Sequence, residues 1–417
     1  MLDAGPDWVL EYPGLRERRG SANFQERYLS GASAWVRRYR YFTPLLPFTD
    51  ATLAALSGCA RSRPRVAFLA NRFVGLARAA HDAGLDSMVF ATNPHEVALA
   101  LAHRLPVASL FAATGHVNSA ALAASSDEQR RRVIRAVELV GRTLRSVAPS
   151  VIVVPNDSLP LPRAVVLAAR LRGTPIVCIQ DGIYMPSDHP DDLHGYESDV
   201  VLVWGEFFRG LYNRARQPNV RVFGYPHPVP HGSRGATVVG SPKTVCFIGQ
   251  PFEAYDHSLE AHKLDIVRTV VEAANRAGWD VVYRPHHGES TEARQLVGAF
   301  VTMAPRQERL GEALARYDAF VGINSTVLIQ AGIHGKSAAQ LRHPAFGDDD
   351  FEAYGAAASV DAHTIDDVAR FLRSVERGTH VRYPRANVVK VCDDVGESFR
   401  TWMEAFLGAS SLNAPSS

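Results

Sequence analysis

The stretch YDAFVGINSTVLIQAGIHGK, residues Tyr317–Lys336, carries the pattern on which the predicted fold depends. Asp318–Val321 predicts a short buried strand, and Asn324–Thr326 supplies three good N-cap candidates. Val327–His334 predicts the helix that follows, and Gly335 fits the position just after its last turn. A helix that starts at the carboxyl end of a strand presents free N–H groups and a positive dipole end, which suits a phosphate. The alternative is that the three polar residues only cap a core helix.

The composition is that of a globular protein with more than one core. A chain of 417 residues is too long for a single ordinary core, so two domains are expected. A formal net charge of +2 argues against general nucleic-acid binding, which needs a strongly basic face. The four cysteines are far apart and show no metal-ligand spacing, which favours buried free thiols in a reducing compartment.

The hydropathy pattern predicts a cytoplasmic protein. Met1–Gly20 contains Asp3, Asp7 and Glu11 and lacks the apolar core of a secretory signal. Val97–Ala113 is the most apolar long window, but His103, Arg104 and Pro106 interrupt it, so it cannot span a bilayer. Trp35–Phe42 mixes arginines with aromatic residues and leaves open a peripheral contact with the inner membrane face. An ordinary amphipathic surface segment is the alternative.

From Arg65 the sequence alternates between short runs rich in Val, Ile and Phe and segments of helical length. Such alternation predicts βαβ units and a parallel sheet. Residues before about Arg61 lack the pattern and are interpreted as an N-terminal extension with some helix. The predicted strands are Arg65–Ala70, Ser87–Ala91, Pro106–Phe111, Val151–Pro155, Ile176–Ile179, Val200–Val203 and Val220–Phe223, and the predicted helices are Phe73–Ala83, Asp127–Val147 and Pro162–Arg172.

A second set of strands and helices follows Gly224–Pro242, a segment dense in Gly, Pro and Ser that is typical of a linker. Besides the stretch quoted first, the predicted strands are Thr244–Ile248, Asp280–Tyr283, Ser337–Leu341 and Ala356–Val360, and the predicted helices are Leu259–Ala277, Arg309–Arg316 and Thr364–Glu376. Val395–Leu407 has helical periodicity and comes after the second set is complete.

Two doubly wound, Rossmann-like domains of α/β class and a surplus C-terminal helix resemble the GT-B architecture of glycosyltransferases. In that architecture the two parallel sheets face each other across a cleft, and the last helix crosses back onto the first domain. The predicted domains are an N-terminal extension (1–60), an N-terminal acceptor domain (61–235), a C-terminal nucleotide-sugar donor domain (236–393) and a crossover helix with a tail (394–417). Ligands of such sheets bind beyond the carboxyl ends of the strands.

Polar motifs follow three further predicted strands. Gln180-Asp181-Gly182 follows Ile176–Ile179, and a carboxylate before a glycine suits a general base, although an Asp-Gly turn explains the same dipeptide. Gly249 and Gln250 follow Thr244–Ile248, where the glycine permits close approach or marks a plain loop entrance.

Arg284, His286 and His287 follow Asp280–Tyr283 and suit a phosphate or diphosphate. A metal site is not favoured there, because neighbouring side chains of an extended segment point to opposite faces.

These motifs resemble those of bacterial sialyltransferases, polysialyltransferases and capsule Kdo transferases. Those families have an acidic-acidic-Gly motif in the first domain and a His-Pro and a Ser-Ser or Ser-Thr motif in the second. The counterparts here are Gln180-Asp181-Gly182, Arg284-Pro285-His286 and Ser325-Thr326, within roughly Val151–Arg373. Two features depart from the pattern: Gln180 replaces the first acid, and His286 follows the proline instead of preceding it.

The resemblance implies an inverting, metal-independent glycosyltransferase without a cofactor. It would move a sugar from a nucleotide-activated donor, CMP-sugar favoured, to a cell-surface polysaccharide or glycolipid. A CDP-glycerol-type polyol-phosphate transferase with a histidine base, and a non-catalytic glycan- or nucleotide-binding protein, are the alternatives. The expected residues are catalytic Asp181 and His286; donor-binding Gly249, Gln250, Arg284, His287, Asn324, Ser325 and Thr326; and acceptor-binding Asn156, Asp157, Gly182 and His189.

Two of these assignments have structural alternatives. Asn156 and Asp157 come just before Pro160 and fit a helix cap as well as an acceptor contact. The acidic run Asp348–Asp350 has no regular ligand spacing and is interpreted as solvated loop charge.

Overall fold

The computed structural model describes residues 32–39, 50, 52–53, 65–69, 73–157, 159–184, 186, 197–215, 219–229, 243–252, 256–286 and 288–412, without side chains for 410–412. Two of the predicted site residues, His189 and His287, lie outside the described residues, as do 230–242 of the predicted linker.

The first sheet has seven strands in the order β3-β2-β1-β4-β5-β6-β7, and every neighbouring pair is parallel. The strands are β1 (Arg65–Leu69), β2 (Asp86–Ala91), β3 (Val107–Ser109), β4 (Val151–Val154), β5 (Ile176–Ile179), β6 (Val200–Val203) and β7 (Val220–Val222). The helices of this part are α3 (Val74–Asp82), α4 (Pro94–Ala102), α5 (Phe111–Ala121), α6 (Ser126–Val147), α7 (Pro160–Arg170) and α8 (Glu206–Arg214). Almost all strand residues are buried, as expected for a parallel sheet covered on both faces.

The second sheet has six parallel strands in the order β10-β9-β8-β11-β12-β13. The strands are β8 (Lys243–Ile248), β9 (Trp279–Arg284), β10 (Thr302–Met303), β11 (Ala319–Gly322), β12 (Ser337–Arg342) and β13 (Ala358–Asp361). The helices are α9 (Leu259–Ala277), α10 (Thr291–Gly298), α11 (Leu310–Arg316), α12 (Thr326–Ile333), the 3₁₀ turn η5 (Pro344–Phe346), α13 (Phe351–Tyr354) and α14 (Ile365–Glu376). In both sheets the strand order reverses beside the first strand, which marks the ligand-binding edge of doubly wound folds.

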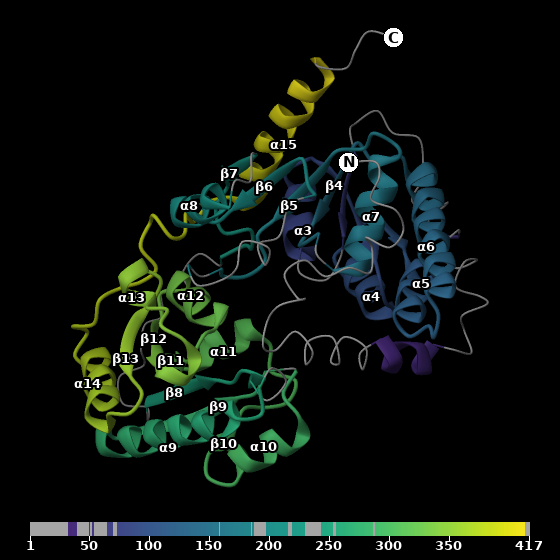
Figure 1. The fold of residues 1–417 in the computed structure, drawn as a ribbon. Coiled ribbons are helices and arrows are strands. Elements are labelled where there is room, and N and C mark those ends of the chain that lie inside the picture. Colours follow the sequence, from purple (N-terminus) through teal and green to yellow (C-terminus); the bar gives the residue numbers. More distant parts are fainter. Residues whose placement is uncertain are drawn as a thin grey trace.

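The chain returns to the first sheet after the second is complete (Figure 1). The N–H of Lys390 donates to the carbonyl of Trp204 at 2.9 Å, and the N–H of Tyr225 donates to the carbonyl of Lys390 at 2.8 Å. Helix α15 (Val395–Leu412) then packs on α3, where Gly396 lies so close to Ala79 that a Cβ would be 2.3 Å from its carbonyl oxygen. The predicted crossover helix is therefore confirmed.

One apolar core joins the two sheets. It contains residues of the first sheet together with Cys246, Phe320 and Leu328 of the second part, while a separate core lies between the second sheet and α9 and α14. The predicted fold class, two doubly wound α/β sheets, is confirmed. The four domain boundaries remain a prediction.

The Val97–Ala113 region was predicted incompletely. It holds the end of α4, the three-residue strand β3 and the start of α5, so the predicted strand Pro106–Phe111 was too long. The reason is that an apolar run gives no period by which to separate a very short strand from flanking buried helices. None of the described helices is long and apolar enough to cross a membrane.

The N-terminal extension contributes a helix at 32–39 and a buried acid, Asp50. Asp50 accepts hydrogen bonds from the N–H groups of Phe111 and Ala112 at 3.1 and 2.8 Å and from the hydroxyl of Ser109. Burial raises the pKa of Asp50 to about 6, although these hydrogen bonds lower it. Asp50 thus caps α5 and attaches the extension to the carboxyl end of β3.

Candidate functional site

The carboxyl ends of β5 and β11 face each other, which brings two of the predicted motifs together. The N–H of Ile183, after β5, donates to the Oγ1 of Thr326 at 3.3 Å, across 143 positions in the sequence. A Cβ on Gly182 would lie 3.7 Å from the same oxygen, an ordinary contact distance. The Asp181-Gly182 turn therefore lies directly against the start of α12.

Gln180 holds this turn in place. Its side chain is fully buried; the Nε2 donates to the carbonyl of Gly182 at 2.7 Å, and the Oε1 accepts from the N–H of Trp204 at 2.9 Å. The indole N–H of Trp204 donates to the carbonyl of Gln180 at 2.9 Å. The neutral amide donates to one partner and accepts from the other, whereas an ionised carboxylate could only accept. This explains why a glutamine occupies the position where the resembled families have an acid.

We expect Gln180→Glu to destabilise the fold at neutral pH. An ionised carboxylate would face the Gly182 carbonyl without a proton to donate, at a cost of about 3 kcal/mol or more. The pKa of the new acid would be raised in the folded state, so stability should be highest below its unfolded pKa and fall as the pH rises through the folded one. Urea unfolding of Gln180→Glu at pH 4.5 and 7 measures the difference.

Gln180→Met is the matched control, since it removes both hydrogen bonds without adding a titrating group. It should be destabilised by a similar amount at both pH values relative to the wild type. Equal stability of Gln180→Glu and the wild type at pH 7 would contradict the role given to the amide.

Asp181 is half-buried, and three buried side chains that carry no charge at neutral pH lie near it. Cys178, Tyr184 and Tyr212 are buried behind it, and burial raises the pKa of each, with the negative charge of Asp181 adding to the effect. The two tyrosine rings meet edge to face at 6.0 Å. These groups stay protonated at neutral pH, so they add no charge of their own beside the Asp181 carboxylate.

The side chains of Asn156 and Asp157 have structural partners. The Oδ1 of Asn156 accepts from the N–H of Leu159 at 3.2 Å, in the turn before α7. Leu159 is the N-cap residue of α7, so Asn156 does not cap the helix. Asp157 is buried and accepts from the N–H of Glu197 at 2.8 Å and the hydroxyl of Ser198 at 3.1 Å. Their predicted contact with an acceptor remains a prediction.

Three predicted donor motifs lie at the carboxyl ends of three adjacent strands of the second sheet. Arg284 ends β9, Gly249 and Gln250 follow β8, and Ser325 and Thr326 follow β11. With a strand spacing of about 4.8 Å, the ends of β9 and β11 are roughly 10 Å apart. A nucleotide diphosphate or a nucleotide monophosphate with its sugar is long enough to reach from one to the other.

A buried carboxylate that the sequence analysis missed stabilises the backbone at the carboxyl end of β9. The Oε1 of Glu289 accepts from the hydroxyl of Tyr283 at 3.0 Å and from the N–H of His286 at 3.1 Å. A Cβ on Gly249 would lie 2.2 Å from that oxygen, so the glycine makes room for Glu289 and Tyr283. Only the closeness of Glu289 to the Arg-Pro-His motif could have drawn attention to it.

The imidazole of His286 is held in one tautomer. The backbone N–H of Gly288 donates to its Nδ1 at 3.1 Å. A backbone N–H is always a donor, so Nδ1 must be the acceptor and the ring proton sits on Nε2. The Nε2–H of His286 is therefore a hydrogen-bond donor. Because Nε2 already carries this hydrogen, it cannot act as a base.

The guanidinium of Arg284 already interacts with two groups of the protein. Its guanidinium donates to the carbonyl of Glu308 at 3.4 Å, and its charge lowers the pKa of Cys246, which burial raises to about 12. Lys263, another residue the sequence analysis missed, is fully buried on α9 and donates to the carbonyl of Gln250 at 3.5 Å. Its signal was available, since the sequence has only four lysines.

Ser325 is the N-cap of α12, with its hydroxyl accepting from the N–H of Val327 at 3.3 Å. The predicted cap is confirmed. Asn324 instead fixes the loop after β12: its Nδ2 donates to the carbonyl of Phe346 at 3.2 Å, and its Oδ1 accepts from Gln340 at 2.9 Å.

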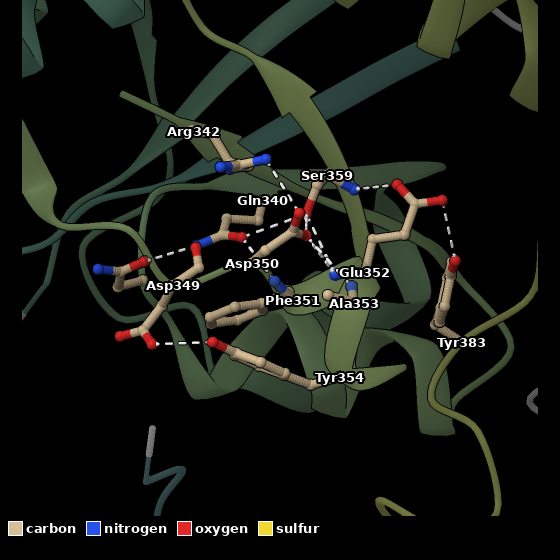
Figure 2. A network of polar contacts seen from close by, with 11 residues as sticks. Gln340, Arg342, Asp349, Asp350, Phe351, Glu352, Ala353, Tyr354, Ser359 and Tyr383 are labelled. Carbon is tan, nitrogen blue, oxygen red and sulfur yellow. Dashed lines mark hydrogen bonds and ion pairs between the residues drawn. The ribbon is translucent and has the colours of Figure 1, made fainter. Parts of the chain in front are cut away.

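The loop after β12 is stabilised by a polar network centred on Gln340 and Asp350 (Figure 2). Gln340 accepts from the N–H of Phe351 at 2.9 Å, and Asp350 accepts from the hydroxyl of Ser359 at 2.6 Å and from Arg342 at 2.9 Å. Burial raises the pKa of Asp350, but these bonds outweigh it and the pKa is lowered. The interpretation of Asp348–Asp350 as solvated charge was wrong for Asp350, which caps α13.

Among the described residues, no group of three or more His, Cys, Asp or Glu side chains is arranged to hold a metal ion. The expectation of metal-independent chemistry remains a prediction.

The sequence matches no protein-family model and no curated protein. Solved structures match the fold. A putative UDP-N-acetylglucosamine 2-epimerase from Listeria monocytogenes has a TM-score of 0.55 at 12% identity, over 85% of this chain and 97% of that one. The UDP-GlcNAc 2-epimerase of Methanocaldococcus jannaschii in complex with UDP-GlcNAc and UDP has a TM-score of 0.54 at 13% identity, over 82% and 99%. CalG4, the calicheamicin glycosyltransferase, has a TM-score of 0.50 at 14% identity, over 85% of this chain and 100% of that one.

At these identities the similarities concern the fold. They confirm the predicted GT-B-like arrangement of two Rossmann-like parts. The resemblance to sialyltransferases and Kdo transferases, and the roles of the site residues, stay predictions.

Proposed function

We propose that this protein is a glycosyltransferase that moves a sugar from a nucleotide-activated donor, CMP-sugar favoured, to a surface polysaccharide or glycolipid. The observation that carries the proposal is the Asp181-Gly182 turn held against the start of α12, with Ile183 donating to Thr326 at 3.3 Å. Sugar transfer needs a base for the acceptor and a binding site for the donor phosphate. Here the first sheet supplies a carboxylate, and the second supplies a helix N-terminus suited to a phosphate. The solved structures of the same fold include a protein named as a UDP-GlcNAc 2-epimerase and one named as a glycosyltransferase.

In the proposed mechanism Asp181 removes the proton of the acceptor hydroxyl, which attacks the anomeric carbon with inversion. The bond to the donor phosphate breaks, and the charge that develops on the departing nucleotide is stabilised by the Nε2–H of His286, by Arg284 and by the N–H groups at the start of α12. Gly249, Gln250, Asn324, Ser325 and Thr326, together with His287, complete the proposed donor site. Gly182, Asn156, Asp157 and His189 are the proposed acceptor side.

The tautomer of His286 favours this chemistry over polyol-phosphate transfer by a histidine base. A base must present a nitrogen lone pair to the attacking hydroxyl, but Nδ1 is occupied by the N–H of Gly288 and Nε2 carries the proton. His286 is therefore suited to donate a hydrogen bond to a phosphate oxygen.

Product analysis with CMP-, UDP- and GDP-sugars and CDP-glycerol tests the proposal. A glycosyltransferase releases the nucleotide and forms a glycoside, and a polyol-phosphate transferase forms a phosphodiester. An epimerase, the activity named for two of the similar structures, would yield an epimeric nucleotide-sugar and transfer nothing to an acceptor. Binding at 100 times the dissociation constant should add about 2.7 kcal/mol of stability, so a thermal-shift screen of CMP, CDP, UDP and GDP identifies the nucleotide first.

We expect turnover to continue in EDTA. The proposed donor site supplies Arg284, the N–H of His286 and the positive end of α12, which together offset the charge that a divalent cation balances in metal-dependent enzymes. The rate should change less than twofold when EDTA replaces Mg²⁺. Complete loss of transfer in EDTA, restored by Mg²⁺ or Mn²⁺, would show that the leaving group depends on a cation.

A further inference from the structure

Helices α6 and α7 form an exposed groove on the first part of the molecule, away from the motifs described above. Its volume is about 770 Å³, and its floor includes Val137, Gly141 and Ala168. Two large apolar side chains stand out along its edges: Leu171 is 65% exposed and Ile134 is 40% exposed. Single exposed apolar residues are common, but here two lie on the rim of one groove.

The rim of this groove is strongly basic. Arg135, Arg142, Arg145 and Arg172 line it, against a single acid, Glu138, which pairs with Arg135 at 2.8 Å. Among the described residues Arg142, Arg145 and Arg172 have no ion-pair partner. Arginine side chains combine a long apolar stem with a cationic end, so they extend the apolar surface and surround it with positive charge.

Charge decides which occupant the groove fits. A second copy of the chain packed through the same face would bring two sets of arginines together in a symmetric contact, which repulsion disfavours. An anionic bilayer offers the complementary arrangement, because phosphates lie at its surface and acyl chains directly beneath.

We propose that the α6–α7 groove is a docking surface for an anionic phospholipid membrane. Leu171 and Ile134 enter the acyl boundary, and Arg142, Arg145 and Arg172 contact lipid phosphates. The surface is distinct from Trp35–Phe42, the segment that the sequence singled out for peripheral contact, and it does not depend on the proposed transfer reaction. It holds the first part of the molecule at a membrane, where a lipid-linked acceptor would be found.

Co-sedimentation with vesicles tests the proposal on the full chain. The wild type should bind vesicles of phosphatidylcholine with 30% phosphatidylglycerol and should not bind pure phosphatidylcholine. Each arginine near an anionic surface is worth about a fivefold change in partition. Arg142→Glu with Arg145→Glu should therefore lower partition at least 25-fold, and Leu171→Ser with Ile134→Ser should lower it several-fold at unchanged charge.

The control reverses two exposed arginines of the second part, Arg306→Glu with Arg377→Glu, which changes the net charge by the same amount. It should keep most of the binding. Equal loss in this control would show non-specific attraction and overturn the proposal, as would absence of binding by the wild type, or binding unaffected by the leucine and isoleucine changes. A concentration-dependent dimer in ultracentrifugation that Arg142→Glu with Arg145→Glu abolishes would assign the surface to a second copy instead.

Discussion

Replacing Asp181 with asparagine should lower turnover by about 10²–10⁴-fold while donor affinity stays nearly constant, because a general base contributes this much to rate. The substitution preserves the shape of the side chain but removes its ability to take a proton. The donor is expected on the second sheet, so its binding should not change. Initial rates with saturating donor, together with calorimetric titration of the nucleotide, measure the two quantities separately.

Asp157→Asn provides the comparison for Asp181→Asn. Asp157 lies beyond the neighbouring strand β4, and its carboxylate is tied to the N–H of Glu197 and the hydroxyl of Ser198. Its variant should lose stability, but at saturating acceptor its rate per folded molecule should be much closer to the wild type than that of Asp181→Asn. Wild-type transfer by Asp181→Asn would place the base elsewhere, with His189 next to be tested. If Asp181→Asn does not fold, Asp181 is a structural turn residue.

The sequence was sufficient for most strands because a buried parallel strand is a continuous apolar run between turn residues. Ile176–Ile179 and Val200–Val203 were predicted with the bounds that the structure shows. Helix α9 was also predicted with its observed bounds, since Gly278 ends it in the left-handed conformation, at φ 73°. A helix that follows a short strand directly, as α5 follows β3, was not separable in this way.

The candidate site was predictable only as separate motifs. That Asp181 and Ser325 belong to strand ends follows from local patterns, but the contact between Ile183 and Thr326 depends on how two sheets pack. The supporting residues carry no local signal for a similar reason. Glu289 matters because Gly249, 40 positions earlier, leaves space for it, and Gln180 matters because Trp204 follows the next strand.

Removing the imidazole of His286 should lower turnover by about 10²–10³-fold, the effect of losing one donor to a developing negative charge. His286→Gln distinguishes between roles for this residue, because an amide can place an N–H close to the position of Nε2 but cannot act as a base. If His286 donates to the leaving phosphate, His286→Gln should keep much more activity than His286→Ala. If it is a base, the two variants should be equally inactive.

The same residue and Ser325 should together determine nucleotide affinity. Ser325→Ala removes the N-cap of α12, at about 1 kcal/mol of stability, and loosens the N–H groups proposed to bind the phosphate. Combined with His286→Ala, it should weaken the best nucleotide about tenfold or more in calorimetry, while circular dichroism stays that of the wild type. The control Ser290→Ala removes the N-cap of α10 and should leave affinity unchanged. If the double variant binds the nucleotide as tightly as the wild type, the donor phosphate does not lie at this edge of the second sheet.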